Sequence, residues 1–248
     1  LFTETAGVNS VVIESVSDLD AVARAIARSS CLFSAQMCTS PQVIYVEPPL
    51  ADTFGQALVD QIDAIAADPA QASGIMGAIQ GNVSLKAVSD VRAAVEMRDD
   101  IHVLREAEPY AHPQFPNART LTPLVIAVAG SAPDLYAEEH FGPVLFVVAM
   151  EGDAAVREAT DLARTHGAIS NYLYSVDEAF IDQATPLYEA AGANLSINLT
   201  GAMWINFAAA YSDYHVTGLN PAGNACLTDT AFVASRFRIV QRRRPAST

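Results

Sequence analysis

Two adjoining segments, Ser34-Ala35-Gln36-Met37-Cys38-Thr39-Ser40-Pro41 and Gln42-Val43-Ile44-Tyr45-Val46-Glu47, set the architecture of this chain. The second segment is a short apolar run rich in β-branched residues, and it predicts a buried strand that Pro48 ends. The first segment is polar and breaks all periodicity. Cys38 is therefore predicted to lie in a loop that leads directly into a buried strand.

A helix is predicted immediately before this loop. Ser17 is the expected N-cap, with the acidic Asp20 three residues later, and apolar residues then recur at helical spacing to about residues 30–33. The β-branched run from Asn9 to Glu14 comes before the helix and predicts another buried strand. The order strand, helix, loop, strand is typical of parallel β-sheets.

The same alternation continues along the chain. Helices are expected over residues 53–67, 86–98, 153–165 and 178–191, and strands over residues 101–104, 124–129, 144–149, 169–175 and 195–199. The last part is less regular, with a long loop over residues 211–228 and a closing strand over residues 232–241. The predicted fold class is α/β: one domain with a largely parallel sheet and helices on both faces.

Composition excludes several classes of protein. A net charge of −14 and a pI near 4.6 argue against nucleic acid as a partner, because a phosphate backbone needs clustered Lys and Arg. The one basic run, Arg242-Arg243-Arg244, is interpreted as a solvated tail. No apolar run reaches the length of a membrane span. Hydrophobic residues make up 51% of the chain, which favours a large interface besides the core and hence a homo-oligomer.

Cysteine usage indicates a reducing compartment. Three cysteines, an odd number, fit free thiols in the cytoplasm, and their spacing matches no zinc motif, so no metal site is expected. Cys31 lies on the predicted helix and is interpreted as core, and Cys226 as structural. Cys38 is different because polar residues flank it, off any helix face.

Cys38 and Glu4 form the candidate catalytic pair. A thiol is a strong nucleophile only as the thiolate, so it needs help from a base, a cation or a helix N-terminus. Glu4 stands 34 residues before Cys38, among small and apolar neighbours, and partial burial would raise its pKa toward the value that suits a general base. His140 and His215 are alternative bases, in which case the protein would be a cysteine hydrolase or an acyltransferase.

A third polar segment, Glu138-Glu139-His140-Phe141-Gly142-Pro143, immediately precedes a very apolar strand. Its charged and aromatic side chains would be displayed at one edge of the sheet, although an ordinary turn would look the same. The chain has no Gly-x-Gly-x-x-Gly, no phosphate-binding P-loop and no Gly-x-Ser-x-Gly. A non-catalytic assembly domain is the remaining alternative.

Taken together, three segments resemble the aldehyde dehydrogenase superfamily in order and in spacing. Thr3-Glu4-Thr5-Ala6-Gly7 resembles its Glu-Leu-Gly-Gly segment, residues 34–38 resemble its Gly-Gln-x-Cys loop, and residues 138–143 resemble its Glu-Glu-Ile-Phe-Gly-Pro segment. The interval from Glu4 to Cys38 is also that of the family. More narrowly, residues 36–42 and 212–218 resemble the branch of phenylacetate degradation.

The resemblance implies an NAD(P)-dependent aldehyde dehydrogenase. Cys38 would attack an aldehyde to form a thiohemiacetal, hydride would pass to NAD or NADP, and Glu4 would activate water to hydrolyse the thioester. The backbone N–H of Cys38 would help to hold the oxyanion. Glu139 and Phe141 would bind the nicotinamide end of the cofactor. The substrate tunnel would include Asn206 and Phe207.

The chain also departs from the family pattern. Ala6 replaces the first glycine after the base, Val8 stands where a lysine is usual, and Ala35 replaces the glycine before Gln36. In the family, a nucleotide-binding half precedes the segment with the glutamate. Residues 1–248 are therefore expected to be the catalytic domain of a longer chain, without the nucleotide-binding domain, inactive by itself and a weak binder of NAD(P).

Overall fold

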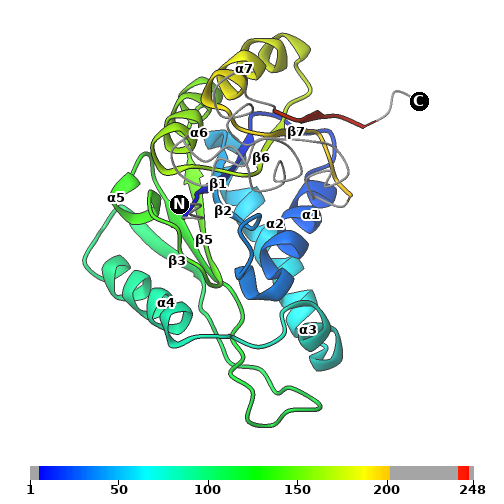
Figure 1. Ribbon diagram of the computed structural model, residues 1–248, viewed down its shortest axis with the longest axis vertical. Coiled ribbons are helices and arrows are strands. Elements are labelled where there is room, and N and C mark those ends of the chain that lie inside the picture. The colour runs from blue at the N-terminus through cyan, green and yellow to red at the C-terminus, as the bar shows by residue number, and fades with distance from the viewer. Residues whose placement is uncertain (1–5, 202–239, 246–248) are drawn as a thin grey trace, which may run out of the picture.

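The structure of the chain is a computed structural model that describes residues 6–201 and 240–245 (Figure 1). In these residues one sheet has eight strands in the order β3-β4-β5-β2-β1-β6-β7-β8. The strands are β1 (Asn9–Ile13), β2 (Pro41–Val46), β3 (Ile101–Arg105), β4 (Leu124–Val128), β5 (Val144–Ala149), β6 (Asn171–Tyr174), β7 (Leu195–Ile197) and β8 (Arg242–Arg243). All pairings are parallel except that of β3 with β4.

Helices cover both faces of this sheet (Figure 1). One face carries α1 (Leu19–Cys31), α2 (Pro48–Ala66) and α3 (Pro69–Ile75). The other face carries α4 (Asn82–Val95), α5 (Pro133–Tyr136), α6 (Gly152–His166) and α7 (Glu178–Ala191). The predicted fold class, a largely parallel α/β sheet between two layers of helices, is confirmed.

The central strands are buried on both sides, which explains their unbroken apolar sequences. In β1, Val11 and Ile13 belong to the core under α1 and α2, whereas Val12 belongs to the core under α6 and α7. Successive side chains of a strand point to opposite faces, so a strand between two helical layers needs apolar residues at every position.

The helices begin at residues that differ from the predicted ones: α1 begins one residue later, and α2 and α4 begin earlier. In α1 the N-cap is Asp18, not Ser17: its carboxylate accepts a hydrogen bond of 2.9 Å from the N–H of Ala21. In α2 the proline that ends the strand also opens the helix, five residues before the predicted start, because proline fits the first turn of a helix. Pro69 and Pro133 open the two short helices α3 and α5 in the same way, and the sequence patterns missed both. Helix α4 begins at Asn82, four residues early.

Two predicted strands are shorter in the structure. Strand β6 begins at Asn171 and not at Ile169, because the N–H groups of Ile169 and Ser170 donate to the side chain of Asn9 instead. Strand β7 ends at Ile197, because Asn198 has a left-handed φ of 53° that turns the chain away.

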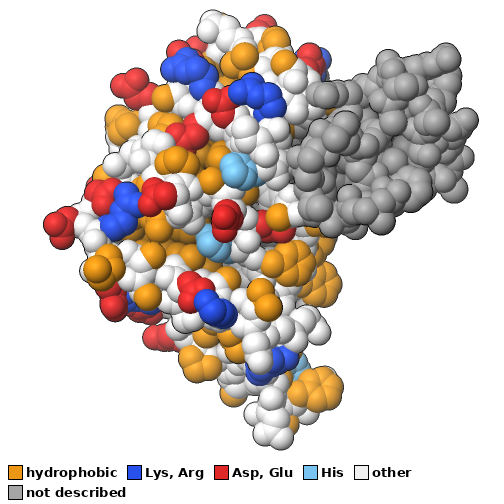
Figure 2. Space-filling model, turned by 60° about the vertical axis from the view of Figure 1, so that its left-hand side comes forward, with side chains coloured by type: hydrophobic (Ala, Val, Ile, Leu, Met, Phe, Trp, Pro, Cys, Tyr) orange, Lys and Arg blue, Asp and Glu red, His pale blue; other side chains and the backbone are white. Residues whose placement is uncertain are grey.

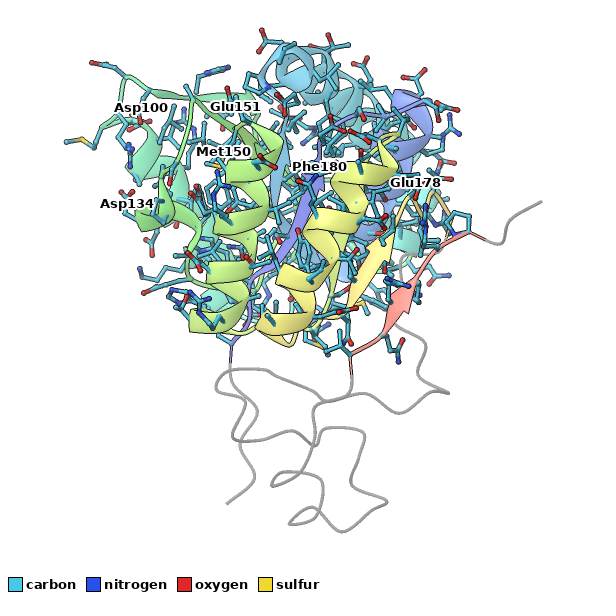
Figure 3. All side chains as sticks on the ribbon, turned by 90° about the horizontal axis from the view of Figure 1, so that it is seen from above. Asp100, Asp134, Met150, Glu151, Glu178 and Phe180 are labelled. Carbon is cyan, nitrogen blue, oxygen red and sulfur yellow. The ribbon has the colours of Figure 1, made fainter. Side chains whose placement is uncertain are left out.

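The C-terminal basic run is not a solvated tail, and that interpretation was wrong. Arg242 and Arg243 form the edge strand β8, and the Arg243 guanidinium donates a hydrogen bond of 2.7 Å to Ser196 Oγ in β7. Arg244 pairs with both carboxylate oxygens of Glu178, at the start of α7 on the same side of the molecule (Figure 3). The predicted closing strand over residues 232–241 falls almost wholly outside the described residues, and Gln241 is not in a strand. The predicted loop over residues 211–228 lies outside them as well.

Figure 2 shows acidic, basic and hydrophobic side chains interspersed on the side of the molecule around α4 and α5. Large apolar side chains exposed in the described part include Val83, Met97 and Phe115. A homo-oligomer stays a prediction. A search of the same residues finds no helix with the length and apolar character needed to cross a membrane.

Candidate active site

Cys38 lies at the amino-terminal edge of the sheet, in the loop between the short turn η1 (Leu32–Ala35) and β2. Its side chain is half-buried and packs against the buried Ile169, just before β6. The segment around Glu139 precedes β5 at the same edge, since β5 pairs in parallel with β2. The topology therefore brings the loop of Cys38 and the segment of Glu139 to the same edge of the sheet.

The turn η1 is left-handed. Phe33, Ser34 and Ala35 have φ values of 51°, 55° and 52°, a region that costs a residue with a side chain about 1 kcal/mol each. Ala35 stands where the resembled motif has a glycine, and its positive φ gives the physical reason why glycine suits that position. The buried Ser34 offsets part of this cost, because its hydroxyl donates a hydrogen bond of 3.0 Å to the carbonyl of Met76.

Gln36 fixes the loop of Cys38 to the segment after α3. Its side-chain amide donates to the carbonyl of Ala78 at 3.2 Å, and its carbonyl oxygen accepts from the N–H of Gln80 at 2.7 Å. These bonds hold the chain where it leaves the left-handed turn, two residues before the thiol.

The side chain of Asn9, the first residue of β1, holds the backbone of Cys38 in place. Its amide group donates to the carbonyls of Cys38 at 2.6 Å and Ser40 at 3.0 Å. Its carbonyl oxygen accepts from the N–H groups of Ile169 at 3.0 Å and Ser170 at 2.9 Å. Only 2% of Asn9 is exposed, and all four hydrogen-bonding positions of its side chain are used. One buried amide thus ties the thiol loop to the residue against which the thiol packs.

Gln42 plays the same part for the segment of Glu139. Its amide group donates to the carbonyls of Tyr136 at 3.0 Å and Glu138 at 2.8 Å, and its oxygen accepts from the N–H of His140 at 2.7 Å. Gln42 stands four residues after Cys38. The Gln42 side chain therefore fixes the distance between the thiol loop and the segment that the resemblance assigns to the cofactor.

Glu139 and Phe141 lie on the surface side of this segment. Glu139 is half-buried and lines a small pocket together with Met37 and Ser40, which flank Cys38. Phe141 is 42% exposed. Gly142 follows them at a close approach to α4: a Cβ there would meet the carbonyl oxygen of Ser84 at 3.1 Å, so only glycine fits without a shift of the backbone.

His140 lines the same small pocket, but its ring is engaged within its own segment. Its Nε2 is 2.8 Å from the carbonyl oxygen of Leu135, and its ring lies against Phe146 with centroids 5.6 Å apart. Within residues 6–201 and 240–245 no hydrogen bond joins Cys38 to a histidine. His215, the other alternative base, lies outside the described residues.

The remaining predicted residues fall into those outside the described residues and those within them. Glu4, Asn206, Phe207 and Cys226 lie outside the described residues, so the structure places none of them. Cys31 is buried in the core, as predicted, and burial raises the pKa of its thiol to about 12. In the part of the chain that the structure describes, no group of three His, Cys, Asp or Glu side chains could hold a metal ion.

A cavity of about 410 Å³ opens on the other side of the Cys38 loop, a volume typical of small-molecule sites. Its described lining comes from α1, from the loop itself and from the end of the segment after β7. The residues are Arg24, Ala25, Arg28, Ser29, Leu32, Met37, Thr39, Ser40, Thr200 and Gly201. Met37 and Ser40 of the Cys38 loop line both this cavity and the smaller pocket of Glu139, so the loop lies between the two.

Sequence reasoning missed Asn9 and Gln42 as residues of the site. It treated both only as strand residues. The available signal was an amide at or near the first position of an otherwise apolar strand, where a buried polar side chain must find partners.

Comparisons with known proteins identify the family of this chain. The sequence model of the Aldehyde dehydrogenase family matches residues 1–203. N-succinylglutamate 5-semialdehyde dehydrogenase of Pseudomonas fluorescens (strain Pf0-1) is 30% identical over 207 residues, which are 82% of this chain and 40% of that protein. The chain thus spans less than half the length of this relative.

Two solved structures extend the comparison. An NAD-dependent aldehyde dehydrogenase from Burkholderia multivorans is 40% identical, with a TM-score of 0.81 over 96% of this chain and 44% of that one. The NADP-dependent glyceraldehyde-3-phosphate dehydrogenase from Bacillus halodurans C-125, complexed with NADP, is 18% identical, with a TM-score of 0.59 over 79% of this chain and 38% of that one; it supports the fold alone. By sequence and by fold, the chain belongs to the aldehyde dehydrogenase family.

Proposed function

We propose that this chain is the catalytic part of a longer NAD(P)-dependent aldehyde dehydrogenase, with Cys38 as the nucleophile. The observation that carries the proposal is the position of Cys38: its loop is held by Asn9 and Gln36 between a cavity and the pocket of Glu139. Neutral amides do all of this holding. The thiol therefore need not serve as an anchor.

The chemistry begins at the sulfur atom. The Cys38 thiolate attacks the carbonyl carbon, a C–S bond forms, and the carbonyl π-electrons move to oxygen. The backbone N–H of Cys38 has no hydrogen-bond partner among the described residues, so it is available to donate to that oxygen. The carbonyl of Met37 lies in the same planar peptide unit as this N–H and accepts a hydrogen bond of 2.9 Å from the N–H of Ser40, so the direction of the Cys38 N–H is set before the substrate arrives.

Glu139 and Phe141 are the residues of this chain that would hold the nicotinamide end of NAD(P). The half-buried carboxylate of Glu139 beside Met37 and Ser40 suits ribose hydroxyl groups, and the exposed ring of Phe141 offers an apolar face. The bound cofactor supplies a hydride acceptor, which leaves an acyl thioester on Cys38. Water then cleaves the C–S bond, with Glu4 as the proposed base, to give the carboxylic acid and the free thiol. Overall, aldehyde, water and NAD(P)+ give carboxylate, NAD(P)H and two protons.

The substrate follows from narrower similarities. The Pseudomonas relative is named for a semialdehyde, and residues 36–42 and 212–218 resemble the branch of phenylacetate degradation. A semialdehyde, including a CoA-linked semialdehyde of phenylacetate degradation, is therefore the proposed substrate class.

The test uses the full-length protein that contains this chain, with a panel of aldehydes that includes CoA-linked semialdehydes. Formation of NAD(P)H is followed by absorbance, for the wild type, Cys38→Ala and Cys31→Ala. The wild type and Cys31→Ala should reduce NAD(P)+, and Cys38→Ala should not. Reduction of NAD(P)+ by Cys38→Ala at the wild-type rate would refute the proposal.

The same assay on residues 1–248 alone tests the proposed division of labour. We expect no turnover and weak cofactor binding, because Glu139 and Phe141 contact only one end of a dinucleotide. Tight binding of NAD to residues 1–248 in isothermal titration would contradict that division.

A further inference from the structure

We propose that the cavity beside Cys38 recognises the carboxylate at the far end of an aldehyde substrate through Arg24 and Arg28. This inference rests on the proposed function and deepens it, since it assigns a charge to the part of the substrate that does not react. The juxtaposition that carries it is a cavity of about 410 Å³ with Met37, Thr39 and Ser40 on one side and two arginines on another.

The two arginines form the only charged part of the described lining of this cavity. Arg24 and Arg28 are one helical turn apart on α1, so both lie on the same face of that helix. No acidic side chain is among the described lining residues. The chain has 28 acidic and 14 basic residues, so most of its surface would repel an anionic substrate. The positive charge of the two arginines makes this cavity an exception.

Neither arginine is engaged elsewhere in the described structure. Within residues 6–201 and 240–245, neither side chain forms an ion pair, although Asp20 lies one turn before Arg24 on the same helix. Like charges four residues apart destabilise a helix slightly. Arg28 lies in the last turn of α1, where the helix dipole favours a cation. Arg24 lies nearer the middle of the helix, so the dipole does not explain its charge.

The rest of the lining suits the carbon chain of such a substrate. Ala25 and Leu32, of the same chain segment as the arginines, and Met37 of the Cys38 loop supply apolar surface to this lining. Guanidinium groups bind carboxylates through paired N–H donors, so two of them can orient an acid at one end while the aldehyde reaches Cys38 at the other. A molecule with a carbonyl, a short aliphatic chain and a carboxylate therefore matches the kinds of groups in this lining, with Met37 and Thr39 as the residues next to Cys38.

A second cavity provides the main rival explanation for the arginines. Arg24 and Arg28 also line a cavity of about 190 Å³ with Gln61, Ala64, Ile65 and Gln71, from α2 and α3. No residue of the Cys38 loop is among its described lining. An anion bound only there would not alter the choice between aldehydes, so selectivity separates the two cavities.

The experiment compares aldehydes that differ only in terminal charge. Full-length protein is assayed with ω-carboxy aldehydes of four to eight carbons and with the uncharged methyl esters, in the wild type, Arg24→Gln, Arg28→Gln and the double variant. Arg157→Gln is the matched control, because Arg157 is an exposed arginine without an ion pair in the described structure, on α6 across the sheet.

We expect the preference for the acid over its ester, as a ratio of kcat/KM, to fall about 3-fold in each single variant and about 10-fold in the double variant. The loss should lie in KM, with kcat unchanged, because the arginines bind a group that does not react. Arg28→Glu should shift the preference toward amino aldehydes. Unchanged ratios in the double variant, with normal oxidation of the ester, would overturn the inference and leave the proposed function intact.

A binding measurement tests the same inference without catalysis. Adipate carries a carboxylate at each end and cannot be oxidised by this chemistry, so it serves as the probe in isothermal titration against the full-length wild type and double variant. Weaker binding by the double variant, and weaker binding by the wild type as salt screens the charges, supports recognition of the carboxylate by the two arginines, and the selectivity measurement assigns that recognition to the cavity beside Cys38. Equal binding by both proteins would overturn it.

Discussion

The two edges of the parallel sheet use polar side chains differently: amides hold loops at both edges, including Asn198 on Ser175 at the carboxyl-terminal edge, but carboxylates join them there. At the amino-terminal edge, the amides of Asn9, Gln42 and Asn194 hold the loops, and each stands at or just before the start of a strand. At the carboxyl-terminal edge, carboxylates take part: Glu14 accepts from Ser175 Oγ at 2.6 Å, and Glu47 accepts from the N–H of Gly152 at 2.8 Å.

This difference bears on where chemistry can occur. The carboxylates at the carboxyl-terminal edge already accept structural hydrogen bonds, so they are poorly suited to act as bases or ligands. At the amino-terminal edge, neutral amides carry the structure, and Cys38 keeps its thiol free. Parallel α/β sheets commonly bind ligands at the carboxyl ends of their strands. Here the candidate site lies at the opposite edge, because the anchors there carry no charge.

The carboxyl-terminal edge is also closed by packing. Phe180 of α7 lies over the start of α6, close to Glu151 (Figure 3). A Cβ at Gly152 would meet both the Phe180 ring and the Glu14 side chain at 3.0 Å. Packing therefore fills this part of the edge, and the cavity farther along it, beside Ser175 and Asn198, has only about 180 Å³, compared with about 410 Å³ beside the loop of Cys38.

The largest expected effect concerns the thiol itself. In the full-length protein, Cys38→Ala should lower kcat/KM for aldehyde oxidation by at least about 1,000-fold, because no other group can form the thioester. Near neutral pH, iodoacetamide should label Cys38 and spare Cys31, whose buried thiol has its pKa raised to about 12. Mass spectrometry of the labelled peptides measures this selectivity. Labelling of Cys31 before Cys38 would reverse the assignment.

The second prediction compares the two edges directly. Asn9→Ala leaves two buried N–H groups and two carbonyls without partners, which should lower the free energy of unfolding by about 3 kcal/mol and reduce activity strongly. Glu14→Gln, at the other edge, should cost about 1 kcal/mol of stability and leave activity unchanged.

Urea unfolding and steady-state assays measure these two quantities. Asn9→Asp serves as a further control, since it keeps the acceptor for Ile169 and Ser170 but loses both donors. If Glu14→Gln impaired catalysis as much as Asn9→Ala, the two edges would not differ in function.

Gln42 allows a third, smaller test. Gln42→Leu removes three hydrogen bonds to the segment of Glu139 but none to the loop of Cys38. We therefore expect KM for NAD(P) to rise about 10-fold, with a smaller change in KM for the aldehyde. Gln56→Leu is the control, because the exposed Gln56 bonds only to Asp60 of its own helix. Equal increases in both KM values would mean that Gln42 does not act through the cofactor segment.

The smallest effect belongs to the exposed ion pair that holds the edge strand β8. In this pair, the hydrogen bond from the Arg244 guanidinium lowers the pKa of the Glu178 carboxyl. A carboxyl with a lowered pKa contributes stability above its unfolded pKa, and the contribution is lost as the pH falls through the folded value. Arg244→Gln should therefore lower Tm slightly near neutral pH and not at all in acid. A Tm difference that grew in acid would exclude this pair as its cause.

The sequence predicted local features of this molecule well and distant ones poorly. The apolar runs around Cys38 were enough to place it in a loop before a buried strand. They could not reveal the role of Asn9, because its partners lie 29 to 161 residues away in the chain. The basic run at residues 242–244 was misread for the same reason, since its partners Ser196 and Glu178 are distant. The assigned roles of Glu4, Asn206 and Phe207 stay predictions.

The left-handed turn of Phe33, Ser34 and Ala35 restricts insertions and deletions in the loop before Cys38. Between that turn and the anchor on Asn9 there are only two residues before the sulfur. Inserting or deleting one residue there would rotate the thiol away from Ile169 and break the bonds of Gln36. The segment should thus accept substitutions, including glycine at Ala35, yet reject any insertion, so that its register is fixed more tightly than its composition.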